Sequence, residues 1–269
     1  MKVLAVLRDP CFSPDAVEKD EAIMMAVVQR LETRGCEVTV VNEANVAAVI
    51  KDNVSVDGEA NVAVDGGFSP DIVLSMGRYP ETLRQLKALG VRVINAPEAV
   101  ARCKRSTLLT IMQEAGVPVP PQEGAHGYWL KRNDCAGALT PEDVVFAADK
   151  VALDAQIEAF RQRGVVDYVV SAHVVGNELK LYGVKAAGFF RYYYSAKDGS
   201  RCSFDAQGLQ DAAERLAAAV GIEVYGGDCI VKEDGTFCII DFNDWPSFSR
   251  CREEAAEAIV AACDLKNKE

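Results

Sequence analysis

The sequence predicts an α/β protein of two or three compact lobes, the first of which holds a small, mainly parallel sheet. Three observations lead to this expectation. The chain has 269 residues, more than one small domain usually contains. Short apolar runs alternate with helical patterns over residues 1–96, as in open parallel sheets. Apolar runs at residues 229–231 and 237–240 flank an Asp-Gly turn and predict a hairpin near the C-terminus.

The composition excludes several classes of protein. With 49% hydrophobic and 26% charged residues, the chain is expected to be globular and not disordered. A net charge of −11 without a Lys/Arg-rich block argues against nucleic acid or an anionic membrane as a partner. No apolar run approaches the ~18 residues of a membrane-spanning helix, and the early charges do not fit a signal peptide. Nine cysteines without a C-x-x-C pair favour a reduced, cytoplasmic location.

Strands and helices alternate through the first 96 residues. Residues 3–7 form a near-continuous apolar run, which is typical of a buried parallel strand. A helical stripe over residues 17–34 follows a Ser-Pro start and ends at a glycine. Three more strands and one helix are expected, at residues 37–41, 72–76, 92–95 and 81–89. Residues 43–70 are ambiguous, although residues 54–64 can form a small hairpin.

Polar residues stand at the carboxyl ends of these strands, where ligands bind in open α/β sheets. The three groups are Arg8-Asp9, Asn42-Glu43 and Gly77-Arg78-Tyr79. Arg78 is therefore a candidate to hold an anionic substrate. An exposed loop cation is nevertheless the more frequent reading of a single arginine at such a position.

The middle of the chain mixes helical and extended patterns. A helical region begins at Pro97 and ends at Gly116, before the proline-rich residues 117–121, which predict an extended connector. Residues 128–131 form a short strand with a lysine at its end. Two further strands are expected to meet at a turn around Gly176-Asn177. The remaining elements are amphipathic helices at residues 154–162, 209–220 and 252–263 and a strand at residues 188–194.

The C-terminal hairpin gathers polar side chains at one end. Asp228 opens its first strand, whereas Asp241 and Asn243 close the second. Alternation puts Asp241 and Asn243 on one face, and antiparallel pairing brings Asp228 level with them. Two carboxylates and an amide oxygen suit Mg²⁺, which takes one or two carboxylates together with substrate phosphates. On spacing alone, solvated acids at strand ends explain the pattern about equally well.

The order Asp228, then Asp241-x-Asn243, then Pro246-Ser247 resembles the metal-binding signature that closes the ATP-grasp fold. Residues 93–118 and 167–184 resemble two earlier segments of that fold in the same order. The resemblance implies a lobe at residues 1–96, followed by two α+β lobes, at 97–170 and 171–269, that clasp the nucleotide. It also implies ATP and Mg²⁺, with two ions expected and Mn²⁺ as an alternative, held by Asp228, Asp241 and Asn243.

The resemblance also assigns residues to the phosphates of ATP. In the family, a basic residue at the start of the helix before Gly-Val-Pro reaches these phosphates. Arg105 matches it, with Lys104 as the near alternative, although lysine is commoner there. Lys131 matches the lysine of the central strand that contacts the α- and β-phosphates. The loop at residues 132–138 departs from the family, because it holds a single glycine where most members have several.

Further matches concern the nucleoside and the acceptor. Ala172, His173 and Val174 match the hinge whose backbone groups read the adenine edge; His173 is also a tempting general base, but a place beside the adenine is favoured. Glu178 matches the acid that binds the ribose hydroxyls. Lys180, on the same strand face, matches a basic residue that contacts the γ-phosphate or the acceptor. Arg191 is a candidate clamp for the acceptor.

Three functions stay open at this stage. The first is a ligase that activates a carboxylate as an acylphosphate, which an amine or a thiol then attacks. The second is a kinase that phosphorylates a polyol or inositol-phosphate hydroxyl, because residues 180–184 and 241–248 are also similar to inositol polyphosphate kinases. The third is a nucleotide-binding module without catalysis. The acceptor is a small molecule in the first two cases, and a homodimer is compatible with all three.

Overall fold

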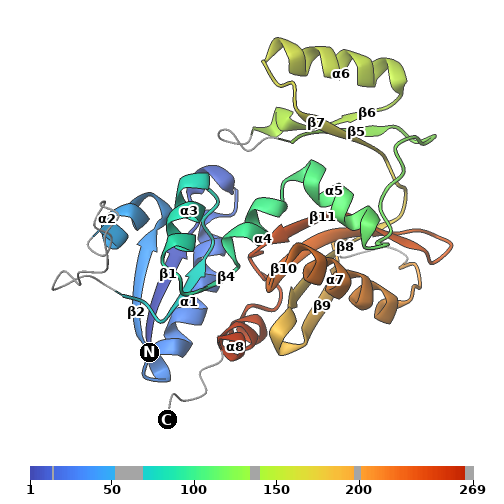
Figure 1. The fold of residues 1–269 in the computed structure, drawn as a ribbon. Coiled ribbons are helices and arrows are strands. Elements are labelled where there is room, and N and C mark those ends of the chain that lie inside the picture. The colour runs from blue at the N-terminus through green and yellow to red at the C-terminus, as the bar shows by residue number, and fades with distance from the viewer. Residues whose placement is uncertain (14, 52–68, 134–139, 197–200, 264–269) are drawn as a thin grey trace.

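The computed structural model describes residues 1–13, 15–51, 69–133, 140–196 and 201–263. The strands form three separate sheets (Figure 1), each associated with its own helices. The hairpin expected at residues 54–64 and most of the loop that follows Lys131 lie outside the described residues. Among the helices that are described, none is long and apolar enough to cross a membrane.

The first sheet is parallel and has the strand order β2-β1-β3-β4, which confirms the predicted N-terminal α/β lobe. Its strands are β1 (Lys2–Leu7), β2 (Glu37–Asn42), β3 (Ile72–Ser75) and β4 (Arg92–Ile94). Helix α1 (Val17–Thr33) packs on one face of the sheet, while α2 (Val46–Lys51) and α3 (Pro80–Ala88) pack on the other. The apolar runs of β1 and β3 are continuous because both of their faces are covered.

The second sheet is antiparallel, with β5 (Tyr128–Arg132) at its centre between β6 (Val144–Ala147) and β7 (Tyr168–Ala172). Helix α6 (Lys150–Gln162) covers one face, where its residues Leu153 and Phe160 bury the strand residue Leu130. Alternation along β5 therefore turns Trp129 and Lys131 to the opposite face, away from α6.

The third sheet is antiparallel and has the order β11-β10-β8-β9. Its strands are β8 (Asn177–Val184), β9 (Phe189–Tyr194), β10 (Val224–Val231) and β11 (Phe237–Asp244). Helices α4 (Pro97–Arg102), α5 (Arg105–Glu114) and α7 (Ala206–Val220) share a core with one face of it. On the other face, Tyr182 and Val184 pack toward α8 (Arg252–Ala262). Short 3-10 helices occur at Pro10–Phe12, Glu43–Asn45, Pro141–Asp143 and Lys185–Ala187.

The helical region that begins at Pro97 consists of two helices, α4 and α5, which are separated at Cys103-Lys104. Contrary to the sequence prediction, the strands on either side of Gly176-Asn177 do not pair with each other. Strand β7 pairs with β5 of the second sheet, whereas β8 pairs with β9 and β10 of the third. Residues 173–176 therefore connect two sheets.

Buried polar contacts join the first sheet to the third. The side chain of Asn95 accepts hydrogen bonds from the N–H groups of Glu223 and Val224 and donates one to the Val224 carbonyl. The Trp245 indole donates to the Ile94 carbonyl at 3.1 Å. Helix α8 packs on α1 within the same core. The first and third sheets thus share one hydrophobic core, while the lobe boundaries at residues 96 and 170 stay predictions.

We predict that Phe160→Ala lowers the free energy of unfolding by about 3–5 kcal/mol, because it empties the core under the second sheet. Urea unfolding measures this change. The matched control is Val151→Ala on the same helix, where the side chain is 80% exposed and the effect should stay within about 0.5 kcal/mol. Equal effects of the two substitutions would show that α6 does not stabilise the lobe through this core.

Candidate functional site

The hairpin of β10 and β11 brings the predicted polar residues together. Asp228 lies directly opposite Asp241, and the register shifts between Asp228 and Cys229, where β11 contains one extra residue. Asn243 lies on the same face as Asp241 and donates a hydrogen bond to the Asp241 carboxylate at 3.0 Å. Three oxygen-bearing side chains therefore converge on one face of the third sheet. Because β10 and β11 are longer than the sequence predicted, Asp228 and Asp241 lie within these strands and not at their ends.

Lys180 is the cationic partner of this group. It lies opposite Asp228 on the neighbouring strand β8, and its Nζ donates to the Asp228 carboxylate at 2.8 Å. Burial raises the pKa of Asp228, although the Lys180 ammonium lowers it in part. Burial lowers the pKa of Lys180, but the contact with Asp228 outweighs it and the pKa is raised. A half-buried carboxylate thus depends on one nearby cation for its charge.

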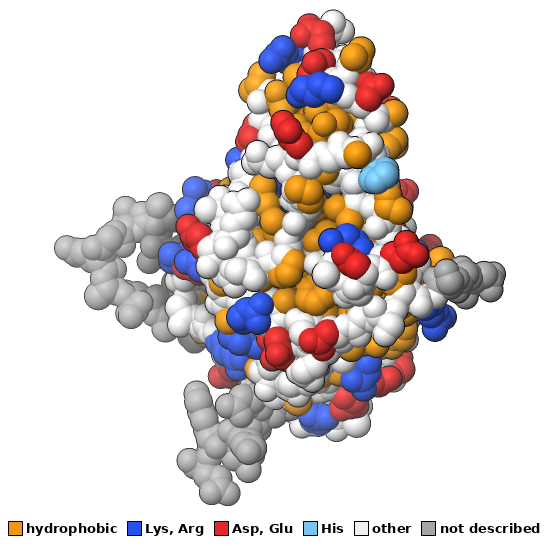
Figure 2. All heavy atoms as spheres, turned by 90° about the vertical axis from the view of Figure 1, so that its right-hand side faces the viewer, with side chains coloured by type: hydrophobic (Ala, Val, Ile, Leu, Met, Phe, Trp, Pro, Cys, Tyr) orange, Lys and Arg blue, Asp and Glu red, His pale blue; other side chains and the backbone are white. Residues whose placement is uncertain are grey.

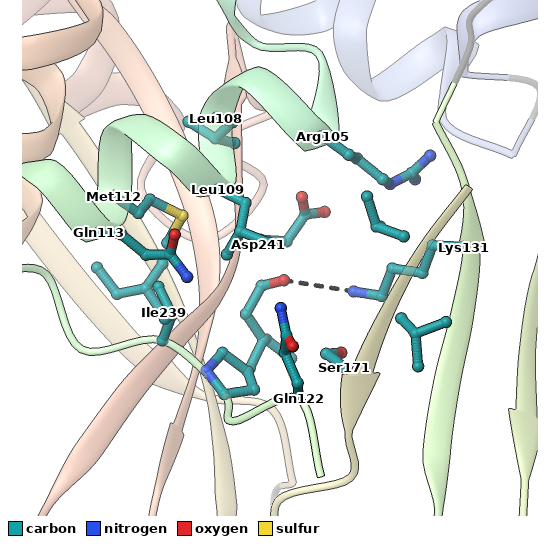
Figure 3. A pocket seen from close by; sticks show the side chains of 15 residues that line it. Arg105, Leu108, Leu109, Met112, Gln113, Gln122, Lys131, Ser171, Ile239 and Asp241 are labelled. Atoms are coloured by element: carbon teal, nitrogen blue, oxygen red, sulfur yellow. Dashed lines mark hydrogen bonds between the residues drawn. The ribbon is translucent and has the colours of Figure 1, made fainter. Parts of the chain in front are cut away.

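Two of the basic residues matched to the phosphates line the same cavity as Asp241. This cavity of about 70 Å³ is also lined by apolar residues of α5 and β11, and Figure 3 shows Arg105, Lys131 and Asp241 around it. The Lys131 Nζ donates to the Ile240 carbonyl at 3.3 Å. Arg105 reaches the Arg132 carbonyl from the first turn of α5. Cationic side chains of α5 and the second sheet therefore line one cavity together with an acidic side chain of the third sheet.

The alternative to Arg105 lies elsewhere. Lys104 precedes the first turn of α5, and its Nζ donates to the Asp167 carboxylate at 2.9 Å. It does not belong to the described lining of the cavity that Arg105 and Lys131 share. Of the two basic residues, Arg105 is thus the one that lines the same cavity as Asp241.

The predicted hinge borders a second, larger cavity of about 730 Å³, which is also lined by the hairpin turn and the loop after the proline-rich connector. Two hinge amides are already engaged, since the Ala172 N–H donates to Pro121 and the His173 N–H donates to Gly127, each at 2.8 Å. Among the residues that the structure describes, the Val174 N–H has no acceptor. If the hinge reads a ligand through an N–H group, Val174 is its available donor.

An aromatic surface continues from the hinge along the second sheet. The Trp129 indole donates to His173 Nδ1 at 3.1 Å, and the Phe146 ring lies edge-on to the His173 ring at 5.4 Å. Phe146 is 46% exposed although it is large and apolar. Figure 2 shows exposed hydrophobic side chains, with charges of both signs nearby, where the molecule narrows below the upper lobe. This surface offers an apolar platform on the same sheet face as Lys131.

The remaining predicted residues divide into two groups. Glu178 lies on the strand face of Lys180, 3.9 Å from its Nζ, and accepts a hydrogen bond from the Ser195 hydroxyl. Arg191 instead pairs with Glu254 of α8 at 2.6 Å and lies over the Phe189 ring. The structure therefore brings Glu178 close to the hairpin residues and ties Arg191 to the helix α8.

Arg78 is not the exposed loop cation that its sequence position favours. Its guanidinium contacts the Asp244 carboxylate at 2.5 Å, and its side chain is 21% exposed. Asp244 is buried, yet the guanidinium groups of Arg78 and Arg8 outweigh the effect of burial and hold the pKa of Asp244 below its usual range. Reasoning from the sequence did not identify Asp244 as a site residue. Its position directly after Asn243 was the one signal that could have indicated it.

The donor set at the hairpin fits a hard cation. Within the described residues, no group of three or more His, Cys, Asp and Glu side chains is arranged to hold a metal ion. The candidate set is instead two carboxylates and the Asn243 amide oxygen, all of them hard oxygen donors. Such a set suits Mg²⁺ better than softer metals, which prefer nitrogen or sulfur ligands.

We predict that Lys180→Met raises the pKa of the Asp228 carboxyl further, because the ammonium that favours its ionised form is lost. A carboxyl group with a raised pKa in the folded state ionises less readily there than in the unfolded chain. The free energy of unfolding therefore falls as the pH rises from 3.8, the unfolded pKa, to the folded pKa. Over this pH range, the free energy of unfolding of the variant should fall further than that of the wild type. NMR titration of the carboxyl groups and urea unfolding measure both effects.

The control for this prediction is Lys185→Met, which removes an exposed lysine just beyond the end of β8. It should leave both the Asp228 titration and its pH dependence as in the wild type. An unchanged Asp228 titration in Lys180→Met would show that Lys180 does not control the charge of Asp228.

Solved structures place this architecture among known proteins, although no protein-family profile matches the chain. A RimK domain ATP-grasp protein from Sphaerobacter thermophilus superposes with a TM-score of 0.65 at 17% identity, covering 98% of this chain and 99% of the other. The D-alanine–D-alanine ligase of Bacillus anthracis gives 0.65 at 14% identity, covering 96% and 92%. The ATP-grasp ligase PsnB gives 0.62 at 17% identity, covering 97% and 98%.

Two curated proteins are also similar to this chain in sequence. Human beta-citrylglutamate synthase B is 25% identical over 278 aligned positions, which cover 86% of this chain and 70% of that protein. The mouse protein of the same name is 28% identical over 193 positions, which cover 60% of this chain and 49% of the mouse protein. The fold comparisons and the ordered sequence motifs agree, and the chain has the fold of the ATP-grasp proteins.

Proposed function

We propose that this protein is an ATP- and Mg²⁺-dependent ligase, which activates a carboxylate as an acylphosphate for attack by an amine or a thiol. One observation carries the proposal above the others. Arg105, Lys131 and Asp241 come from three different elements and line one cavity. Two cations and a candidate metal-binding acid around one cavity match the needs of a transferring phosphoryl group, whose charge must be neutralised.

In this proposal each basic residue binds a different part of the ATP triphosphate. Lys131, near the end of the central strand, binds the α- and β-phosphates, and Arg105 binds the phosphate chain from the first turn of α5. Lys180 reaches the γ-phosphate or the acceptor from the same strand face as Glu178. Mg²⁺ held by Asp228, Asp241 and Asn243 would neutralise charge between the β- and γ-phosphates.

The nucleoside would lie between the second and third sheets. The exposed aromatic surface beside His173 supports a place for the adenine ring, and the Val174 N–H is suited to its edge. Glu178 would accept hydrogen bonds from the ribose hydroxyls. Arg78 and Arg191 stay candidates for the acceptor, with Arg78 nearer to the metal residues through its contact with Asp244.

The relatives favour a ligase over the kinase. The D-alanine and PsnB proteins are named ligases and the curated relatives are named synthases, so neither group supports the kinase alternative. Because these names refer to different products, they do not specify the acceptor of this chain. A non-catalytic module is disfavoured by the charged residues that converge on one cavity.

An acceptor screen tests the proposed reaction. The protein is incubated with ATP and Mg²⁺ together with pairs drawn from carboxylic acids, amino acids and thiols, and the release of ADP and phosphate is measured. Release that requires both an acid and an amine or thiol supports the ligase. Release driven by a polyol alone would establish the kinase instead. Tight ATP binding without turnover across the panel would leave only the binding module.

We predict that Asp241→Ala lowers turnover about 10³-fold, the effect of losing several kcal/mol of charge stabilisation by a bound cation. Its unfolding free energy should change by less than about 1 kcal/mol, because the side chain is only partly buried and lies on an edge strand. Steady-state kinetics and urea unfolding are the measurements. Glu233→Ala, an exposed acid in the turn of the same hairpin, should be unaffected. Near wild-type turnover in Asp241→Ala contradicts the metal assignment.

We predict that Lys131→Ala weakens ATP binding by about ten- to a hundredfold, since a hydrogen bond to a charged group contributes about 1.5–3 kcal/mol. Calorimetric titration with ATP and Mg²⁺ measures the dissociation constant. Lys185→Ala, which removes an exposed lysine of the same charge, is the control. Equal affinities of the wild type and Lys131→Ala would remove Lys131 from the nucleotide site.

A further inference from the structure

Asp244 lies directly after the candidate metal residue Asn243 and is almost completely buried, with 1% of its side chain exposed. Its two carboxylate oxygens accept hydrogen bonds from different arginines. Arg8 Nη2 donates to Oδ2 at 3.3 Å, and Arg78 Nη2 donates to Oδ1 at 2.5 Å. The same Arg8 nitrogen also reaches the backbone carbonyls of Asp244 at 3.1 Å and Trp245 at 3.0 Å.

Both arginines come from the carboxyl ends of neighbouring strands in the first sheet. Arg8 follows β1 directly, and Arg78 follows β3 after two residues. Ligands usually occupy this position in an open α/β sheet. Here a carboxylate of the third sheet occupies it, so the end of β11 is bound where a small anion would otherwise bind.

The loop that carries Arg78 is itself fixed by a buried acid. Glu43, which lies after β2 and is buried, accepts hydrogen bonds from the N–H groups of Arg78 at 2.6 Å and Tyr79 at 2.7 Å. Arg8 is fixed in a similar way, because its Nη1 donates to the buried Asp20 carboxylate of α1 at 3.0 Å. Both guanidinium groups are thus held in place from the side of the first sheet.

Strand β11 needs this support because it is the edge strand of the third sheet. It pairs with β10 along one side, where the register ends at Tyr225 opposite Asp244. On its other side, Pro118 accepts from Ile239 at 2.9 Å and Lys131 donates to the Ile240 carbonyl. Beyond these points, the Trp245 N–H donates to the Val224 carbonyl at 3.2 Å, and Arg8 donates to the carbonyls of Asp244 and Trp245.

We propose that Asp244 is a positioning residue through which Arg8 and Arg78 hold the end of β11, so that Asp241 and Asn243 keep the geometry that a metal ion needs. This inference rests on the proposed function, since it concerns the same metal ligands. Residues that orient metal ligands from outside the coordination sphere commonly change metal affinity when they are replaced. Asp244 acts here through the backbone that it shares with Asn243.

Mn²⁺ binding tests the proposal without any acceptor or turnover. The free Mn²⁺ concentration is followed by electron paramagnetic resonance while the protein is titrated in the presence of a non-hydrolysable ATP analogue. Asp244→Asn keeps the size of the side chain but removes its charge, and it should raise the Mn²⁺ dissociation constant about ten- to a hundredfold. Circular dichroism and urea unfolding report on the fold of each variant.

Asp143→Asn is the matched control, because Asp143 is a buried carboxylate that likewise pairs with an arginine, Arg163, but lies beside the second sheet. It should destabilise the protein as Asp244→Asn does and leave the Mn²⁺ dissociation constant within about twofold of wild type. Equal weakening by the two variants would overturn the proposal, because the effect would then follow stability and not position. An unchanged constant in Asp244→Asn would overturn it as well.

Arg78→Gln keeps the test valid if Asp244→Asn does not fold. The Arg78 side chain is 21% exposed. In this variant Arg8 is unchanged, and its hydrogen bonds to the end of β11 remain. This variant should raise the Mn²⁺ dissociation constant several-fold, and an unchanged constant overturns the proposal. A wild-type protein that binds no Mn²⁺ with the nucleotide analogue would instead overturn the proposed function on which the inference rests.

Discussion

The pairing of β10 with β11 is the constraint on which the site depends, and the irregularity within it decides which residues face the second sheet. Cys229 lies opposite Ile239, so a regular ladder would put Ile240 opposite Asp228. The extra residue at this point places Asp241 there instead. Because neighbouring residues on a strand point to opposite faces, a regular ladder would have turned Asp241 toward the core under α7. One inserted residue thus converts a buried position into a position beside Asp228 and Lys180.

The other sheets supply the groups that complete this face. The first sheet shares a core with the third and holds the end of β11 through Arg8 and Arg78, whereas the second sheet carries its own core under α6. Lys131 extends from the second sheet to the edge of β11. A phosphate chain bound between Lys131 and Asp241 would therefore bridge two separately packed parts of the molecule.

The sequence predicts those features that depend on local patterns. The apolar runs of β1 and β3 and the stripes of α1 and α7 follow from periodicity, and the Asp-Gly turn predicts the β10–β11 hairpin. The separation of β7 and β8 into different sheets depends on long-range partners, which adjacent strands cannot reveal. The ion pair of Arg78 with Asp244 joins residues far apart in the chain, and the extra residue at Ile240 leaves no compositional signal. The residue types of the site were thus accessible, whereas their orientation was not.

The contact between Trp129 and His173 determines which tautomer the imidazole adopts. An indole nitrogen can only donate a hydrogen bond, so Nδ1 of His173 must accept it through a lone pair. The ring proton then sits on Nε2 and gives His173 a second nitrogen that donates. In this arrangement the side chain presents a donor to whatever lies beside the hinge, while the indole occupies the lone pair of its other nitrogen.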